Sequence, residues 1–170
     1  MTLIQGFPPV ADSDAQRLVI GSMPSRASLA AGEYYAHPRN AFWRIVAAVF
    51  ALPEELDYEA RCRALKAHRI ALWDTLSACA RTTSLDSDIV DDSIVTNDFA
   101  GFLAAHPGIR EIGCNGLKSH QVFERRVRPA LPDAQASIPV VRLPSTSPAN
   151  ASMRFETKLD RWRAFLAPGT

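Results

Sequence analysis

The sequence predicts an α/β protein in which a parallel sheet is covered by helices, and three observations support this prediction. The chain has 170 residues, of which 47% are hydrophobic and 22% are charged, and this fits one folded domain with an ordinary core. Short apolar runs bounded by turn residues indicate buried strands. Segments with helical spacing alternate with these runs, and such alternation favours a parallel sheet.

Four apolar runs are the expected strands, and each leads into a segment rich in Gly, Ser, Asn or Pro. They cover residues 18–20, 70–73, 109–114 and 140–143. In sheets of this kind, ligands bind beyond the carboxyl ends of the strands. The loops that follow the four runs are therefore where we expect a functional site.

Residues 42–50 give the clearest helical signal. The apolar side chains there recur at i, i+3, i+4, i+7 and i+8, and the pattern stops before Pro53. Weaker helical patterns cover residues 54–68, 98–105, 119–127 and 154–166. We expect residues 1–16 to form a loose lead-in, and residues 1–170 to form a single domain.

Charge is distributed unevenly along a chain whose net charge is only +1. Residues 1–53 carry 4 basic and 3 acidic side chains, residues 54–98 carry 5 and 10, and residues 99–170 carry 10 and 5. The last segment contains Arg125, Arg126, Arg128, Arg142 and Arg154. These side chains form either a face that contacts phosphates or an ordinary solvated helix surface.

Composition also excludes several classes of protein. No apolar run approaches the roughly 20 residues that span a bilayer, and the first residues lack the features of a secretory signal. We therefore expect no membrane association and a cytoplasmic location. The three cysteines are far apart and contain no C-x-x-C pair, so neither a disulfide framework nor a metal site is predicted, and each fits a small buried side chain.

Polar and aromatic residues crowd the segment between the first strand and the first helix. Residues 21–25 read Gly-Ser-Met-Pro-Ser, and residues 34–43 read Tyr-Tyr-Ala-His-Pro-Arg-Asn-Ala-Phe-Trp. Paired aromatic rings beside amide and imidazole groups are typical of a pocket for a flat heterocycle. Asn40 fits an ordinary helix N-cap equally well, and His37 fits an ordinary loop residue. Both interpretations stay open at this point.

Two further loops follow the third and fourth strands. Asn115-Gly116 places an amide at the same edge of the sheet, although Asn-Gly alone is typical of a simple turn. Residues 143–150 read Leu-Pro-Ser-Thr-Ser-Pro-Ala-Asn, a stiff loop with short hydroxyl donors that suit phosphate oxygens. A capped turn leading into the last helix explains this loop as well.

Taken in order, these segments resemble the successive motifs of the uracil-DNA glycosylase superfamily, and most of all its hypoxanthine-DNA glycosylase branch. The resemblance runs from about Arg17 to the last helix. It implies a three-layer α/β/α sandwich on a four-stranded parallel sheet, with no metal and no other cofactor. It also implies a monomeric, monofunctional hydrolase of base excision repair that flips a deaminated base out of DNA and cuts its N-glycosidic bond.

The resemblance further implies roles for individual residues. Asn40 positions the attacking water, and His37 either donates to the leaving base or orders its loop. Tyr35 stacks on the base, Asn115 and backbone amides read its edge, and the base-binding residues also include Gly21, Ser22 and Met23. The residues expected to contact DNA are Ser25, Ser145, Thr146, Ser147, Asn150, Arg142 and Arg154.

Met23 is a departure from the pattern of the wider superfamily. The mismatch-specific uracil and thymine glycosylases carry a catalytic Asn at the position of Met23, and a methionine cannot orient water. The hypoxanthine branch also lacks that Asn and is thought to rely on the Asn of its His-Pro-x-Asn segment, here Asn40. The sequence therefore favours deoxyinosine as the substrate.

Three alternatives stay open. The first is a glycosylase that acts on uracil or another damaged base. The second is a serine hydrolase with Ser22 or Ser25 as nucleophile and His37 as base, although the chain has no Gly-x-Ser-x-Gly elbow. The third is a relative that has lost activity and only binds DNA.

Overall fold

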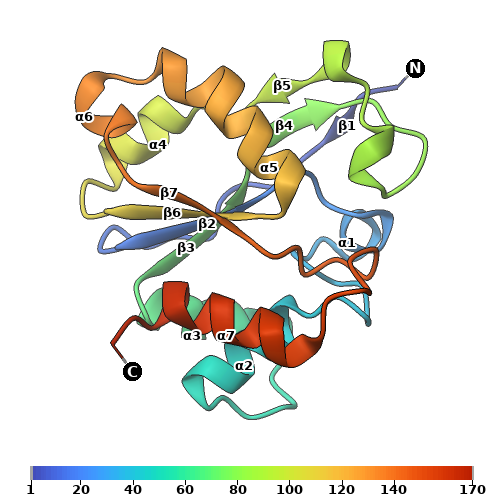
Figure 1. The fold of residues 1–170 in the computed structure, drawn as a ribbon, viewed down its shortest axis with the longest axis vertical. Coiled ribbons are helices and arrows are strands. Elements are labelled where there is room, and N and C mark those ends of the chain that lie inside the picture. The colour runs from blue at the N-terminus through green and yellow to red at the C-terminus, as the bar shows by residue number, and fades with distance from the viewer. Residues whose placement is uncertain (1, 170) are drawn as a thin grey trace.

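A computed structural model describes residues 2–169 as three layers, with a parallel sheet between two layers of helices (Figure 1). The sheet consists of β2 (Arg17–Gly21), β3 (Ile70–Asp74), β6 (Glu111–Asn115) and β7 (Val140–Leu143), in the order β3-β2-β6-β7. All three pairings are parallel, and Gly21 lies opposite Asp74 while Asn115 lies opposite Leu143. The predicted α/β/α sandwich on a four-stranded parallel sheet is confirmed.

One layer contains α2 (Phe42–Phe50), α3 (Tyr58–Ala67) and α7 (Phe155–Leu166), and the other contains α4 (Phe99–Ala105), α5 (Leu117–Val122) and α6 (Asp133–Ala136). A π-helical segment, Phe123–Val127, continues α5. The five predicted helices are confirmed, although α3 begins later than expected because Asp57 caps it by accepting from the Ala60 N–H. α6 and α1 (Arg26–Ala31) were not predicted. Within residues 2–169, none of the helices is long and apolar enough to cross a membrane.

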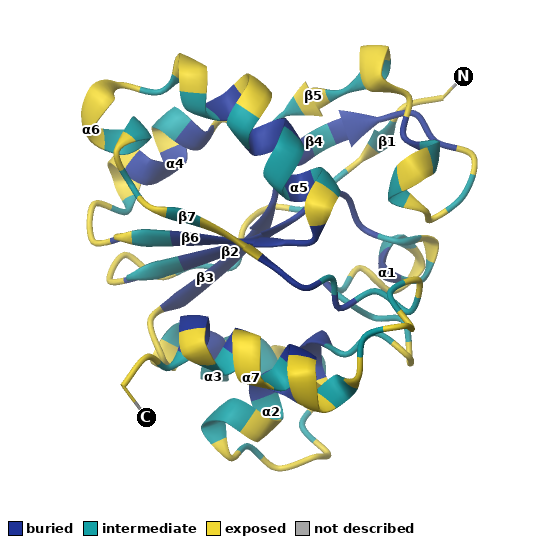
Figure 2. Cartoon of the chain, in the orientation of Figure 1, coloured by how far each residue is buried: buried dark blue, intermediate teal, exposed yellow. Residues whose placement is uncertain are grey.

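The core is divided between the two faces of the sheet because side chains alternate along each strand. Leu18 and Ile20 of β2 pack with α4, α5 and the π-helical segment, whereas Val19 packs with α2, α3 and α7. Figure 2 shows the central strands as buried and the outer surfaces of the helices as exposed.

A second, antiparallel sheet was not predicted. It contains β1 (Ile4–Gln5), β4 (Leu76–Cys79) and β5 (Val95–Thr96) in the order β1-β4-β5. The prediction that residues 1–16 are a loose lead-in is therefore wrong for the described residues 2–16. Ile4 pairs with Cys79, Val10 bridges to Leu72, and Ala15 is only 1% exposed. The backbone hydrogen bonds of β4 and Leu72 attach this segment to the core.

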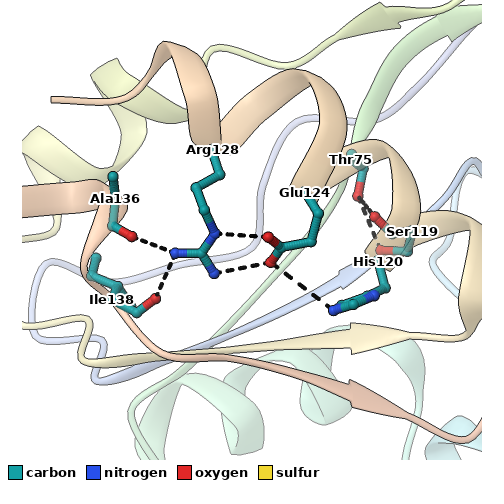
Figure 3. Close-up of polar contacts among 7 residues, drawn as sticks. All are labelled: Thr75, Ser119, His120, Glu124, Arg128, Ala136 and Ile138. Carbon is teal, nitrogen blue, oxygen red and sulfur yellow. Dashed lines mark hydrogen bonds and ion pairs between the residues drawn. The ribbon is translucent and has the colours of Figure 1, made fainter. Parts of the chain in front are cut away.

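Arg128 joins the end of the π-helical segment to the chain that enters β7 (Figure 3). Its guanidinium group donates to both carboxylate oxygens of Glu124 at 2.9 Å and also to the carbonyl oxygens of Ala136 and Ile138. This side chain was predicted as part of a possible phosphate-contacting face. Its donors are used inside the protein instead, so Arg128 belongs to the scaffold.

Candidate active site

A cleft of about 1210 Å³ opens at the carboxyl edge of the parallel sheet. It is lined by the ends of the four strands, the loops that follow β2, β6 and β7, and the segment that precedes α2. The predicted site residues that border this cleft are Gly21, Ser22, Met23, Ser25, Tyr35, His37, Asn40, Asn115, Arg142, Ser145, Thr146, Ser147 and Asn150. Arg154 does not line it. The sequence therefore brought together residues that also meet in the fold.

Asn40 is held at the cleft by hydrogen bonds on both sides of its turn. Its Oδ1 accepts from the Phe42 N–H at 2.9 Å, and its own N–H donates to the carbonyl oxygen of His37 at 2.9 Å. The next residue, Ala41, donates to the carbonyl oxygen of Thr146 at 2.9 Å. Ala41, not Asn40, occupies the N-cap position of α2. The Asn40 side chain still satisfies a first-turn N–H, and its oxygen retains a second lone pair that can accept from a water.

His37 borders the cleft with a defined arrangement of its ring nitrogens. The Nδ1 atom lies 3.1 Å from the backbone nitrogen of Arg39 and accepts its hydrogen. The neutral ring then carries its proton on Nε2. Nε2 is therefore the atom of His37 that can donate to a bound molecule.

Tyr35 and Gly21 meet at the floor of the cleft. Tyr35 has a φ of 56°, its ring stacks on Phe42 with centroids 4.3 Å apart, and its hydroxyl has no hydrogen-bond partner among the described residues. A Cβ atom on Gly21 would lie only 2.8 Å from this hydroxyl and 2.6 Å from Oδ1 of Asp74. Any larger residue at position 21 would therefore displace them. Burial, and then the nearby Asp74, raise the pKa of the Tyr35 phenol, which stays neutral.

Asp74 is a buried acid that the predicted site did not include. It is 3% exposed, and burial raises its pKa from the ordinary 3.8 to about 7. The Asp86 carboxyl raises this pKa further, whereas Arg81 and the Gly21 backbone N–H lower it. A signal was available in the sequence, because Asp74 directly follows the apolar run 70–73 at a strand end.

Asp86 and Ser22 form a second polar contact beside the cleft. The Ser22 hydroxyl donates to Oδ1 of Asp86 at 2.6 Å, and burial raises the pKa of this carboxyl as well. The Ser22 hydroxyl proton is thus committed to an internal acceptor. Asp86, like Asp74, was absent from the predicted site, because nothing in the local pattern indicates that its loop folds back over residues 21–25.

The Met23 side chain contributes to packing. It is 7% exposed and belongs to an apolar cluster with Leu76, Cys79, Ile89 and Val122. Although the residue borders the cleft, its thioether lies among these side chains. Met23 therefore shapes the cleft wall more than it offers a polar contact.

Asn115 and Thr146 are bound to each other. Nδ2 of Asn115 donates to Oγ1 of Thr146 at 2.9 Å, and Oδ1 of Asn115 accepts from the Thr146 N–H at 3.0 Å. Asn115 is 7% exposed and Thr146 is 1% exposed. The pair connects the end of β6 to the loop after β7. This geometry differs from the expectation that Asn115 reads a base edge and that Thr146 contacts DNA, since both side chains already have partners.

Three serine hydroxyls at the cleft have the same arrangement. Oγ accepts from a nearby backbone N–H in each, with Ser25 accepting from Ser28, Ser145 from Ser147, and Ser147 from Ala149, all at 3.2 Å. An Oγ that accepts in this way is held in place while its hydrogen can still point to a ligand oxygen.

Helix α7 supports the loop that carries Ser145 and Ser147. Trp162 Nε1 donates to the carbonyl oxygen of Pro144 at 2.9 Å, and Lys158 Nζ donates to that of Asn150 at 2.8 Å. The Asn150 amide in turn donates to the carbonyl oxygen of Ser145 at 3.0 Å. The loop is thus a firmly supported wall of the cleft, and the donors of Asn150 are already partly used within it.

The arginines predicted to bind phosphate separate into two groups. Arg142 is exposed and lines the cleft, together with Arg26, Lys118 and Arg161, none of which was a predicted site residue. Arg154 is exposed, lies outside the cleft, and has Glu156 3.8 Å away. The cleft rim is therefore basic, but not with the full set of arginines that the sequence suggested.

Two other kinds of site have little support. Ser22 is bound to Asp86, Ser25 caps α1, and His37 accepts from Arg39, so no serine–histidine hydrogen bond occurs among the described residues. A serine hydrolase needs such a bond. Within residues 2–169, the His, Cys, Asp and Glu side chains form no group of three or more that could hold a metal ion.

Comparison with known proteins gives a consistent result. The sequence profile of the uracil DNA glycosylase superfamily matches residues 8–166. Proteins named hypoxanthine DNA glycosylase from Methanosarcina acetivorans and Methanosarcina barkeri are 40% and 36% identical to this chain over 116 residues, which is 68% of this chain and 72% of each relative. A solution NMR structure from Methanosarcina acetivorans, described as a candidate uracil DNA glycosylase, superposes with a TM-score of 0.80 and 34% identity over 97% of both chains.

Proposed function

Because the chain belongs to the uracil DNA glycosylase superfamily, we propose that it is a monofunctional DNA glycosylase that releases hypoxanthine from deoxyinosine in DNA. The family and the names of its relatives support a DNA glycosylase. The single observation that carries the proposal is that Asn40, His37 and Tyr35 line one cleft together with the hydroxyl loop after β7. This cleft has a buried aromatic floor and a basic rim, as a flipped nucleotide requires.

In the proposed reaction, the deoxyinosine nucleotide rotates out of the duplex, and its base enters the cleft beside Tyr35. The bond between C1′ and N9 breaks, and its electron pair leaves with the base. A water held by Oδ1 of Asn40 adds its oxygen to C1′ and loses a proton, and the departing base gains one. An amide is a weak base, so Asn40 acts by placing the water and by electrostatics. The Nε2–H of His37 is available to donate to the departing base.

The DNA backbone is proposed to lie along the cleft rim. The hydroxyls of Ser25, Ser145 and Ser147 would donate to phosphate oxygens on either side of the flipped nucleotide, since each Oγ is fixed by an N–H donor. Arg142 would add charge on the same rim. Asn115 and Thr146 would act indirectly by holding the loop in place.

A panel of duplex oligonucleotides, each with one deoxyinosine, deoxyuridine or deoxyxanthosine, tests this proposal. The protein is incubated with each duplex under single-turnover conditions, and alkali then cleaves the strand at any abasic site. We expect the fastest cleavage with deoxyinosine and no strand cleavage before alkali. Faster cleavage at deoxyuridine would reassign the substrate, and no abasic sites in any duplex would favour a protein that only binds DNA.

A further inference from the structure

The Asp74 carboxyl is the buried polar group at the cleft whose surroundings leave it most incomplete. Its Oδ2 atom is buried and has no hydrogen-bond partner among the described residues, although the residue lines the cleft and is 3% exposed. The great majority of buried polar atoms in folded proteins are hydrogen-bonded. An exception that borders a ligand-sized cleft indicates that a bound molecule supplies the missing partner.

The groups around Asp74 favour its neutral form. Tyr35 and Tyr34 face it with neutral phenols, and Asp86 faces it with a second carboxyl. Arg81 is the opposing charge, but its guanidinium group donates to the Pro24 carbonyl oxygen. Burial and Asp86 together outweigh Arg81 and raise the Asp74 pKa to about 7. Near neutral pH a large share of the molecules therefore carry a carboxylic acid at this position.

The position of the proton follows from Gly21. Its backbone N–H hydrogen-bonds to the carboxyl, and Oδ1 is the carboxyl oxygen that faces Gly21. The neutral carboxyl then carries its hydrogen on Oδ2, the oxygen that lacks a partner. Asp74 thus offers one O–H donor at the cleft floor, beside the hydroxyl of Tyr35.

We propose that Asp74, as a neutral carboxylic acid, donates a hydrogen bond from Oδ2 to the carbonyl oxygen of the flipped base. This inference rests on the proposed function and identifies what its site recognises. Deamination replaces an exocyclic amino group with a carbonyl group, so an O–H donor accepts hypoxanthine and opposes the amino group of adenine at the same place. Asp74 is thus a specificity-determining residue for deaminated bases.

The same hydrogen bond assists the reaction. When the bond from C1′ to the base breaks, negative charge develops on the base and extends to its carbonyl oxygen. A fixed donor in a dry site stabilises this charge more than it stabilises the neutral base, and removal of such a donor typically slows a reaction by about 100-fold to 1000-fold. A carboxylic acid that stays neutral can serve as such a donor, whereas a carboxylate cannot.

The pH dependence of single-turnover hypoxanthine release tests this proposal, with wild type, Asp74→Asn and Asp74→Ala compared between pH 5.5 and pH 9. We expect the wild-type rate to fall as the pH rises through about 7, where Asp74 loses its proton. Asp74→Asn keeps an N–H donor that does not titrate, so this fall should disappear. Asp74→Ala should be slower by about 100-fold at pH 6. A wild-type rate that rises through pH 7, or an alanine variant as fast as wild type, would overturn the proposal.

Asp86→Asn is a matched control, because it removes the neighbouring carboxyl and keeps Asp74. It should move the fall in rate to lower pH, since Asp86 is one cause of the raised Asp74 pKa. Free hypoxanthine provides a readout besides activity, with calorimetric binding to wild type tighter at pH 6 than at pH 8.5 and no such difference for Asp74→Asn. If wild type releases no base from any duplex, the proposed function fails. If it releases hypoxanthine but all variants share one rate profile, only the role of Asp74 fails.

Discussion

Asp74 and Asn115 end the two strands that flank β2, and they differ in how their polar atoms are satisfied. Asn115 is bonded at both ends of its amide to Thr146, whereas Oδ2 of Asp74 has no partner within the described chain. Both side chains are buried and both border the cleft. The difference separates a group that holds the cleft together from a group that awaits a ligand, which similar burial alone would not reveal.

The largest expected effect is on stability, from Asp74→Asn at alkaline pH. The Asp74 pKa is about 7 in the folded protein and near 3.8 when exposed, so this group opposes folding increasingly as the pH rises from about 4 to 7. The penalty at pH 8 is about 4 kcal/mol at most. Asp74→Asn should therefore exceed wild type in unfolding free energy, more at pH 8 than at pH 5, as measured by urea denaturation. Asp92→Asn, at an exposed acid, should show no such gain, and an equal pH slope for wild type and Asp74→Asn would contradict the assignment.

Asn115→Ala should have the opposite sign. It leaves the N–H and hydroxyl of buried Thr146 without their partner, which costs about 2–3 kcal/mol of unfolding free energy. The loss should be the same at pH 5 and pH 8, since no titrating group is removed. Thr146→Ser retains the hydroxyl and is the control, with a loss expected below about 1 kcal/mol. An alanine variant as stable as wild type would remove the distinction between Asn115 and Asp74.

The smallest effect concerns the rim, where Arg142 and Arg154 were predicted together and are placed apart. Arg142 lines the cleft, and Arg154 does not. Arg142→Ala should lower the slope of log Kd against log salt by about one, as expected for the loss of one phosphate contact. Arg154→Ala should leave the slope unchanged. Fluorescence anisotropy with an inosine-containing duplex at several salt concentrations measures both, and equal slopes for the two variants would mean that the cleft does not define the DNA path.

Much of the fold could be predicted because its strands and helices carry their own patterns. The stripe in residues 42–50 and the apolar runs of the parallel sheet need no tertiary information. The strands β1 and β5 could not be predicted, because each has two residues and exists only through pairing with β4.

The same distinction applies to the site. The position of Asn40 next to the helix it precedes is a local property, and the sequence indicated it. The pairing of Asn115 with Thr146 and the burial of Asp74 depend on segments 31 residues or more apart in the chain. Met23 was read as a base contact from its motif, but the packing of β4 and α5 around it decides where its side chain lies.

The most direct test of the glycosylase mechanism is Asn40→Ala, assayed for single-turnover hypoxanthine release and for duplex binding. The Asn40 carbonyl also accepts from the Phe42 N–H, so a loss of about 1 kcal/mol in stability is expected and is measured separately. Arg39→Ala, at the exposed neighbour, is the control. We predict that Asn40→Ala binds the duplex as wild type does and loses most of its base release, while Arg39→Ala keeps its activity. Undiminished release by folded Asn40→Ala would contradict the mechanism.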